Sequence, residues 1–504
     1  MSRRRNRQRP ASGGAPAGAP PPPTEASGSA PFVLGVTLAG FFLRLWYIGQ
    51  PMRYDEAVTY LYFSSKSWLT VVSSYTYPNN HVFHSVLVKA AVTVFGNAPW
   101  AIRLPAFLAG VALIPMTFVV ARRLASETVA LIAAALVAAS GALVLYATNA
   151  RGYDMMALET LFVLYALLRL RERSSFPVWI LVAVAATLGA WTVPVMLYPA
   201  GGLALWFAFA AWRGKTSGGR SDIGPLAFTL LASLVVTALL YAPIMAENGV
   251  TALTSNSFVR PSDWATFTSE LGPGTRDVLL LWTLGVPRVV GVLLAALAAY
   301  GLFARQSSDG RLSMALAMAV WCGTVLIVTH RVPFARVWLF LAPLAAIAAA
   351  RGLAALLARV AAPDTLAKHR GVVAGVTFAV AAGLVIQSRD VLTSRETGTL
   401  PDADAVAQTL VPLLRPGDRV FAPIPSNAPL VYAFVRAGAD TSHFSRQGAA
   451  LAGGYLVVNT GEGQSMQTPV IDPEIKNFPQ AARIAAFSSA ELYRLVRRQD
   501  RQTP

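Results

Sequence analysis

Long apolar runs, separated by short polar segments, occupy most of the chain up to about residue 390. Eleven of these runs are long enough to cross the hydrocarbon core of a bilayer, which takes roughly 20 mostly apolar residues in a helix. The pattern predicts a polytopic α-helical membrane protein. The predicted spans lie near residues 32–48, 100–121, 127–146, 153–170, 176–191, 193–212, 223–244, 287–304, 312–329, 337–357 and 371–387.

A twelfth apolar run, residues 82–96, is shorter and carries Lys89 near its middle. His81, Ser85, Lys89 and Thr93 follow one another at four-residue spacing, which places them in one stripe on a helix with apolar side chains opposite. Such a helix is expected to lie in the membrane interface and not to cross it.

The positions of lysine and arginine predict the orientation of the chain. If residues 82–96 do not cross and the N-terminus is cytoplasmic, the basic loops all fall on the cytoplasmic side, as the positive-inside rule requires. The C-terminus and the loops 49–99 and 245–286 are then extracytoplasmic, together with the turn around Arg151. The basic loops are those with Arg122 and Arg123, with Arg169, Arg171 and Arg173, with Arg213, Lys215 and Arg220, with Arg305 and Arg311, and with Arg359, Lys368 and Arg370.

Composition agrees with a membrane protein, with 55% hydrophobic and 13% charged residues and a mean hydropathy of +0.50. The net charge of +17 would suggest a nucleic-acid partner in a soluble protein, but here the basic residues concentrate in the loops between apolar runs. We therefore predict no nucleic-acid partner. The single cysteine, Cys322, excludes a disulfide within the chain and a thiolate metal cage.

The two ends of the chain differ from the apolar middle. Residues 1–31 are rich in arginine and then in Ala, Pro, Gly and Ser, which predicts a disordered cytoplasmic tail. Residues 32–390 form the predicted transmembrane domain. Residues 395–504 predict a small extracytoplasmic α/β domain that covers the site or docks an acceptor. Its expected elements are helices at 402–414 and 429–437 and strands at 419–422, 455–459 and 491–497.

Tyr54-Asp55-Glu56 follows the first predicted span and begins the outer loop. Carboxylates are costly at a membrane interface unless water or function retains them. One interpretation is a general base at the outer face; the other is a cap on the next helix, because acidic side chains favour helix N-termini. The position just beyond the span favours function.

On the same outer loop, His81 and His84 lie three residues apart at the start of the interfacial helix. Together with a carboxylate they could hold a divalent metal ion. The alternative is that both histidines simply satisfy water and helix N–H groups.

Two arginine-containing segments are expected on the same outer face. In Arg151-Gly152-Tyr153-Asp154 the arginine could pair with a phosphate and Asp154 could orient an acceptor or the arginine; alternatively, the two could form an ion pair that anchors a tight turn. Arg331 and Arg336 lie in an outer loop where the positive-inside rule predicts few arginines, which indicates an anionic ligand or ordinary headgroup contacts.

The order of these motifs resembles that of the GT-C membrane glycosyltransferases, in particular the protein-mannosyltransferase and aminoarabinose-transferase group, which uses polyprenyl-phosphate sugars. The resemblance covers roughly residues 32–360. It implies that Asp55 is the catalytic residue, that Asp154 supports it, and that the sugar comes from a lipid-linked donor. The motifs are Tyr54-Asp55-Glu56, Asn79-Asn80-His81, Trp100-Ala101-Ile102-Arg103-Leu104-Pro105 and Arg151-Gly152-Tyr153-Asp154.

We therefore predict a hexosyl- or pentosyltransferase of the bacterial plasma membrane that acts at the outer face on a glycan, lipid or protein acceptor of the envelope, with inversion. Its partners are membrane lipids and a polyprenyl-phosphate sugar, and a divalent metal is a possible cofactor. The alternative is a lipid or solute transporter, but that class places its ionisable residues near the middle of the membrane. The predicted catalytic residues are Asp55, Glu56 and Asp154, and the predicted substrate- or phosphate-binding residues are Tyr54, Lys89, Arg151, Tyr153, Arg331 and Arg336.

Overall fold

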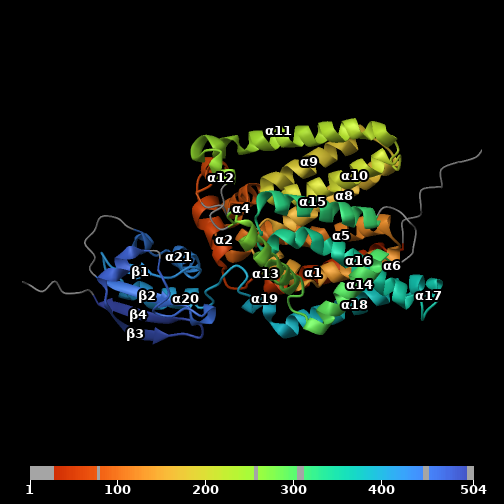
Figure 1. Ribbon diagram of the computed structural model, residues 1–504. Coiled ribbons are helices and arrows are strands. Elements are labelled where there is room, and N and C mark those ends of the chain that lie inside the picture. Colours follow the sequence, from red (N-terminus) through yellow and green to blue (C-terminus); the bar gives the residue numbers. More distant parts are fainter. Residues whose placement is uncertain are drawn as a thin grey trace, which may run out of the picture.

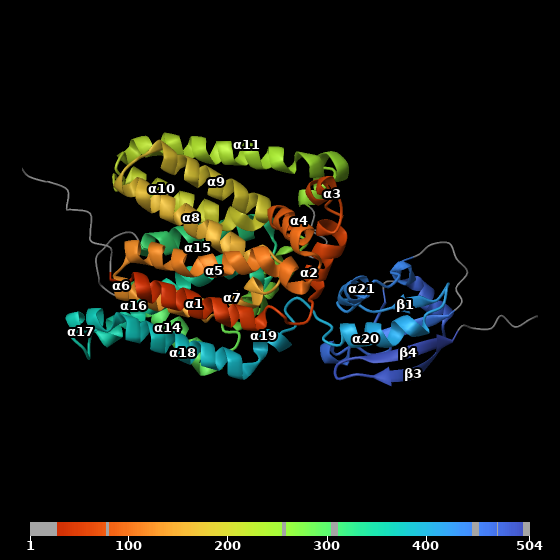
Figure 2. The same cartoon turned by 180° about the vertical axis from the view of Figure 1, so that it is seen from behind.

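A computed structural model describes residues 28–76, 80–254, 259–303, 311–445, 453–470 and 472–496. A large bundle of helices makes up most of the molecule, and a small α/β domain lies against one end of it (Figures 1 and 2). Most of the predicted tail, and Asn79 of the outer-loop motif, fall outside the described residues.

Helices occupy every segment that was predicted to span the membrane. Six of them are long and apolar enough to cross on their own, or seven if the bent pair α6–α7 is one span, counted over the described residues. The fold class of a multi-pass helical membrane protein is confirmed, whereas the count of eleven spans stays a prediction because α8, α9, α14 and α15 are shorter or more polar. The helices are α1 (Ala30–Tyr47), α5 (Pro99–Leu124), α6 (Glu127–Ala138), α7 (Gly141–Ala147), α8 (Tyr153–Glu172), α9 (Phe176–Thr192), α10 (Leu197–Trp212), α11 (Ile223–Asn248), α14 (Arg288–Phe303), α15 (Arg311–Thr329), α16 (Ala342–Leu357) and α18 (Arg370–Ser388).

The predicted span 127–146 is broken, with a bend of 58° between α6 and α7. A break inside an apolar bundle frees backbone carbonyls that must find other partners. The buried Arg44 of α1 is the partner of two of these carbonyls. Its Nη1 donates to the carbonyl of Ala138 at 2.9 Å, and its Nη2 donates to the carbonyl of Val137 at 3.3 Å. The bend directs α7 toward the turn that carries Arg151.

Short elements cover the end of the bundle that faces the α/β domain (Figure 2). The predicted interfacial segment forms a 14-residue helix, α4, that packs on α5, α3 and the π-helix η1. Its position in the interface remains a prediction. The short elements are α2 (Tyr54–Val58), η1 (Thr59–Ser64), α3 (Trp68–Ser73), α4 (Val82–Phe95), η2 (Pro194–Met196), α12 (Thr251–Thr254), η4 (Ala335–Leu341) and α19 (Asp390–Thr393), and the longer α13 (Trp264–Trp282) lies with them; η3 (Gly219–Asp222) and α17 (Pro363–Lys368) lie elsewhere in the chain.

The C-terminal region forms a four-stranded sheet in the order β1-β2-β4-β3. Strands β1 and β2 are parallel, and the other two pairs are antiparallel. The sequence indicated three of these strands and both helices, but not β3, which is mostly alanine and has a single β-branched residue, Ile484, so that it gives a weak strand signal. The elements are α20 (Ala403–Leu410), β1 (Arg419–Phe421), α21 (Asn427–Arg436), β2 (Gly454–Val458), β3 (Gln480–Ala486) and β4 (Glu491–Val496), with 3-10 turns η5 (Val411–Leu413), η6 (Ser442–Phe444), η7 (Thr460–Glu462) and η8 (Pro473–Asn477).

Helix α21 attaches the α/β domain to the first outer loop. Its Tyr432 ring packs edge-on against Tyr60, with centroids 5.6 Å apart, and its hydroxyl donates to the carbonyl of Asn97 at 2.7 Å. Tyr432 and Ala428 are buried in one apolar cluster with residues of α2 and η1. The domain thus packs directly on the loop that carries Asp55.

The predicted cytoplasmic loops meet at the other end of the bundle. Arg123, in the last turn of α5, pairs with Glu172 at 2.6 Å, and Arg171 donates to the carbonyl of Lys215 at 3.5 Å. These contacts join the loops that follow α5, α8 and α10. The bundle therefore has one basic end, far from the α/β domain.

This separation gives a test of the orientation. In a Cys322→Ala background, we expect Ser65→Cys and Gln408→Cys to react with an impermeant maleimide added to intact cells, and Ser126→Cys to react only after the membrane is opened. All three positions are exposed. Labelling of Ser65→Cys only from the cytoplasm would contradict the predicted orientation of the whole chain.

Candidate active site

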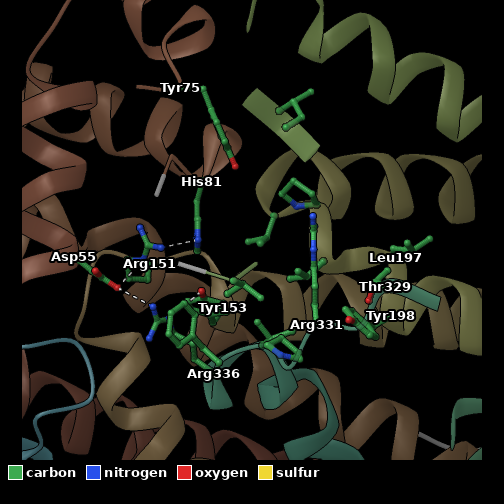
Figure 3. A pocket seen from close by; sticks show the side chains of 18 of the residues that line it. Asp55, Tyr75, His81, Arg151, Tyr153, Leu197, Tyr198, Thr329, Arg331 and Arg336 are labelled. Carbon is green, nitrogen blue, oxygen red and sulfur yellow. Dashed lines mark hydrogen bonds and ion pairs between the residues drawn. The ribbon is translucent and has the colours of Figure 1, made fainter. Parts of the chain in front are cut away.

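A cavity of about 390 Å³ opens at the end of the bundle that faces the α/β domain. Three stretches of chain supply most of its polar lining: the first outer loop, the turn between α7 and α8, and the segment that precedes α16; α10 and α15 add Tyr198 and Thr329 (Figure 3). These stretches meet because α7 and α8 bring their junction under the outer loop. The polar lining residues include Tyr54, Asp55, Tyr75, His81, Arg151, Tyr153, Tyr198, Thr329, Arg331 and Arg336.

Asp55 lies between two guanidinium groups. Its Oδ2 is 3.8 Å from Nε of Arg151 and 3.7 Å from Nη2 of Arg336, and its side chain is 12% exposed. These separations are ion-pair distances longer than a charged hydrogen bond, which is typically about 2.7–2.9 Å. The carboxylate is therefore held in place while neither arginine is closed tightly on it.

The contacts of His81 restrict the role of Arg151. The Gly152 N–H donates to Nδ1 of His81 at 2.9 Å, and Nη2 of Arg151 lies 2.8 Å from Nε2. A neutral imidazole accepts at only one nitrogen, and burial, with the nearby Arg151, lowers the pKa of His81 well below its usual value. Only one of the two contacts can be a hydrogen bond, so the Gly152 N–H and Arg151 compete for one acceptor nitrogen of His81.

Arg336 is fixed from several sides. Its Nε donates to the hydroxyl of Tyr153 at 3.2 Å, and its guanidinium lies 4.1 Å from the centre of the Phe334 ring. Its Nη1 is 3.5 Å from Oε1 of Glu396. The remaining arginine, Arg331, stands apart from this group, nearer Tyr198 and Thr329 (Figure 3).

Glu396 was not among the residues predicted from the sequence. It lies between α19 and α20, and its carboxylate also accepts from the hydroxyl of Tyr146 at 3.1 Å. A single acidic residue in a polar connection gives no motif, and its only signal was its expected position on the outer side after the last span. Tyr75, in the outer loop, was also missed, because it belongs to no motif in the sequence.

Glu56 turns away from the cavity and holds the loop together. The fully buried carboxylate accepts from the backbone N–H groups of Arg53 at 2.8 Å and Ala150 at 3.1 Å, and from Nε of Arg103 at 2.9 Å. Its Oε1, which accepts from the Arg53 N–H, also contacts Nη2 of Arg103. These contacts join the start of α2 to α5 and to the Arg151 turn, and so set the position of Asp55.

Two other predicted residues lie outside the cavity lining. Asp154 is buried in α8 facing α5, where a β-carbon placed on Gly110 would come within 2.7 Å of its Oδ2. Lys89 lies on α4 with its ammonium group 6.0 Å from the centre of the Trp68 ring. Neither can touch a ligand in the cavity without a rearrangement.

The two histidines do not fit a metal site. Within the described residues there is no group of three or more His, Cys, Asp and Glu side chains with the geometry to hold a metal ion. Both nitrogens of His81 already face N–H donors. His84 is fully buried and is not among the residues that line the cavity. We therefore assign no step to a metal.

Comparisons with known proteins agree with this architecture. Residues 81–241 match the model of the dolichyl-phosphate-mannose-protein mannosyltransferase family. The fold is similar to that of ArnT from Cupriavidus metallidurans in the apo state, with a TM-score of 0.60 and 14% identity over 93% of this chain and 98% of ArnT. The ArnT structure with bound undecaprenyl phosphate gives a TM-score of 0.56 and 13% identity over the same shares of the two chains. No curated protein sequence matches the chain.

A further similarity is to the oligosaccharyltransferase AglB from Archaeoglobus fulgidus, with a TM-score of 0.47 and 14% identity over 76% of this chain and 58% of AglB. At this score the likeness adds no argument. The family match and the ArnT fold confirm the resemblance to the GT-C membrane glycosyltransferases and the prediction of a glycosyltransferase.

Proposed function

We propose that this glycosyltransferase moves a sugar from a polyprenyl-phosphate donor to a glycan, lipid or protein acceptor of the bacterial envelope. The observation that carries this proposal is the cavity in which the guanidinium groups of Arg151 and Arg336 flank the carboxylate of Asp55, while Arg331 lines the same cavity farther away. Guanidinium groups recognise phosphate oxygens, and a carboxylate between them can accept a proton.

The proposed reaction is a direct displacement at the anomeric carbon. Asp55 takes the proton of the acceptor hydroxyl while the acceptor oxygen bonds to that carbon on the face opposite the phosphate. The bond between the carbon and the phosphate oxygen breaks, and its electron pair leaves with the polyprenyl phosphate. Arg151 and Arg336 stabilise the negative charge that grows on the leaving phosphate. A phosphate leaves without protonation, so one carboxylate suffices, and the anomeric configuration is inverted.

The other predicted residues take supporting roles in this proposal. Tyr54 and Tyr153 line the cavity and can contact the sugar or phosphate, and Arg331 can contact a more distant part of the donor. Asp154 and Glu56 support the site from behind its wall. Since Lys89 faces Trp68, we propose a headgroup contact for it instead of phosphate binding in the cavity.

Names of similar proteins support the donor class. The matched family is described by a dolichyl-phosphate sugar, and ArnT was solved with undecaprenyl phosphate. We propose a bacterial plasma-membrane location with a cytoplasmic N-terminal tail, a transmembrane domain over residues 32–390, and an extracytoplasmic domain over residues 395–504. The basic end of the bundle, opposite the α/β domain, supports this orientation.

The test uses the purified full-length protein and polyprenyl-phosphate sugars extracted from its native membranes. We expect release of free polyprenyl phosphate together with glycosylation of an envelope extract, and a product whose anomeric configuration, read by NMR, is opposite to that of the donor. Addition of EDTA should leave the rate unchanged. Binding of the lipid with no cleavage, in the presence of all envelope fractions, would contradict the proposal.

A further inference from the structure

The segment that connects the transmembrane bundle to the α/β domain, residues 394–399, lies beside the loops that line the cavity, and its Ser394 and Glu396 line a neighbouring pocket together with Arg336. Arg53 Nη1 donates to the carbonyl of Ser394 at 2.7 Å, and the N–H of Tyr54 donates to the carbonyl of Gly398 at 3.1 Å. Asn149 Nδ2 donates to Oγ1 of Thr397 at 3.1 Å. The segment is thus bonded to both loops that carry the charged residues of the site.

The far end of the same segment is anchored in the α/β domain. The N–H of Thr399 donates to Oε1 of Glu462 at 3.0 Å, and Asn459 Nδ2 donates to the carbonyl of Thr399 at 2.6 Å. Arg395 Nη2 donates to the carbonyl of Gly461 at 2.6 Å. The position of the segment is therefore set jointly by the domain and by the bundle.

Glu396 is the residue of this segment that reaches into the charged group. Its Oε1 lies 3.5 Å from Nη1 of Arg336, whose Nη2 lies 3.7 Å from Oδ2 of Asp55. The hydroxyl of Tyr146 donates to the same Glu396 oxygen at 3.1 Å, which fixes the carboxylate. One guanidinium is thus shared between two carboxylates on opposite sides.

We propose that Glu396 is a positioning residue, which holds Arg336 away from Asp55 so that the guanidinium can receive the donor phosphate. Through it the α/β domain sets the geometry of the donor site. This inference rests on the proposed function, because it needs Arg336 to bind the donor phosphate.

Glu396 can hold Arg336 in place because Asp55 and Glu396 compete for the same guanidinium group. With only Asp55 as an ionic partner, Arg336 is expected to close on it, since a charged hydrogen bond of about 2.8 Å is more favourable than a contact near 3.7 Å. The donor phosphate would then have to displace an internal ion pair before it could bind. Glu396 opposes this closure from the other side, while Tyr153 and Phe334 hold the rest of the guanidinium.

The test measures binding of undecaprenyl phosphate to the purified full-length protein in detergent. Glu396→Gln keeps the size of the side chain and an oxygen that accepts from Tyr146, but removes the charge that faces Arg336. We expect its dissociation constant to rise about tenfold, which is within the range of couplings between residues of one ion-pair network. Arg336→Gln should weaken binding at least as much.

The double variant separates positioning from general damage. If Glu396 acts through Arg336, adding Glu396→Gln to Arg336→Gln should change the dissociation constant less than twofold. Glu462→Gln is the matched control, because it removes a carboxylate charge that pairs with Arg395 of the same segment without touching Arg336, and it should bind the lipid like the wild type. Additive effects, or equal weakening by Glu462→Gln, would overturn the proposal. Wild-type protein that does not bind undecaprenyl phosphate at all would instead contradict the proposed function.

Discussion

Asp55→Asn is expected to lower the rate of sugar transfer by about 10²–10⁴-fold, which is the usual contribution of a general base. The asparagine keeps the size of the side chain and can still occupy the space between Arg151 and Arg336, but it cannot take a proton from the acceptor. The measurement is release of polyprenyl phosphate by the purified enzyme under single-turnover conditions with saturating lipid-linked sugar.

Donor binding separates loss of the base from loss of the site. Because the arginines are assigned to the phosphate, Asp55→Asn should bind undecaprenyl phosphate at least as well as the wild type, and removal of a negative charge beside two guanidiniums favours an anion. Asp440→Asn, an exposed aspartate of the α/β domain, is the control and should transfer at the wild-type rate. An Asp55→Asn enzyme that keeps more than about a tenth of the wild-type rate would rule out Asp55 as the base.

The positions of the helices could be predicted because a bilayer demands long apolar runs, whatever their packing. The break between α6 and α7 was not predicted, because the segment around Ser140 is as apolar as a continuous span. What allows the break is a contact from elsewhere in the chain, the donation by Arg44 to two freed carbonyls. Such a contact leaves no local trace in the sequence.

In the site, Asp55, Arg151, Tyr153, Arg331 and Arg336 were predicted, because their motifs all follow or precede predicted spans on one face, and the structure brings them to one cavity. Their catalytic and binding roles stay predictions.

Asp154 illustrates where the same reasoning reaches its limit. It directly follows Tyr153 in α8, and successive helical residues point about 100° apart, so one side chain lines the cavity while the next packs toward α5. The sequence alone does not tell which of the two faces the ligand. Glu396 was unpredictable for another reason, because its partner Arg336 is 60 residues away and the two meet only through the packing of the connecting segment.

Glu56→Gln is expected to destabilise the protein more than any other conservative change in this loop. It would leave the guanidinium of Arg103 buried without its carboxylate, and breaking a buried ion pair from one side typically costs about 3–5 kcal/mol. The carbonyls of Gln50 and Pro51 still accept from Arg103, at 2.8 and 3.1 Å, but they carry no charge to balance it. The apparent melting temperature of the purified protein in detergent should fall clearly.

The matched control uses a second arginine of α5, Arg123, which pairs with Glu172 of α8 in an exposed position. Glu172→Gln removes the same charge at the surface, where an ion pair contributes at most about 1 kcal/mol, so the melting temperature should barely change. The comparison also decides between the two interpretations of the acidic pair in the sequence. If Glu56→Gln melts like the wild type and yet loses transfer, then Glu56 takes part in the chemistry and does not merely hold the loop. A large fall in melting temperature, with the surviving folded enzyme still able to transfer sugar, is the result that the buried contacts with Arg103, Arg53 and Ala150 lead us to expect.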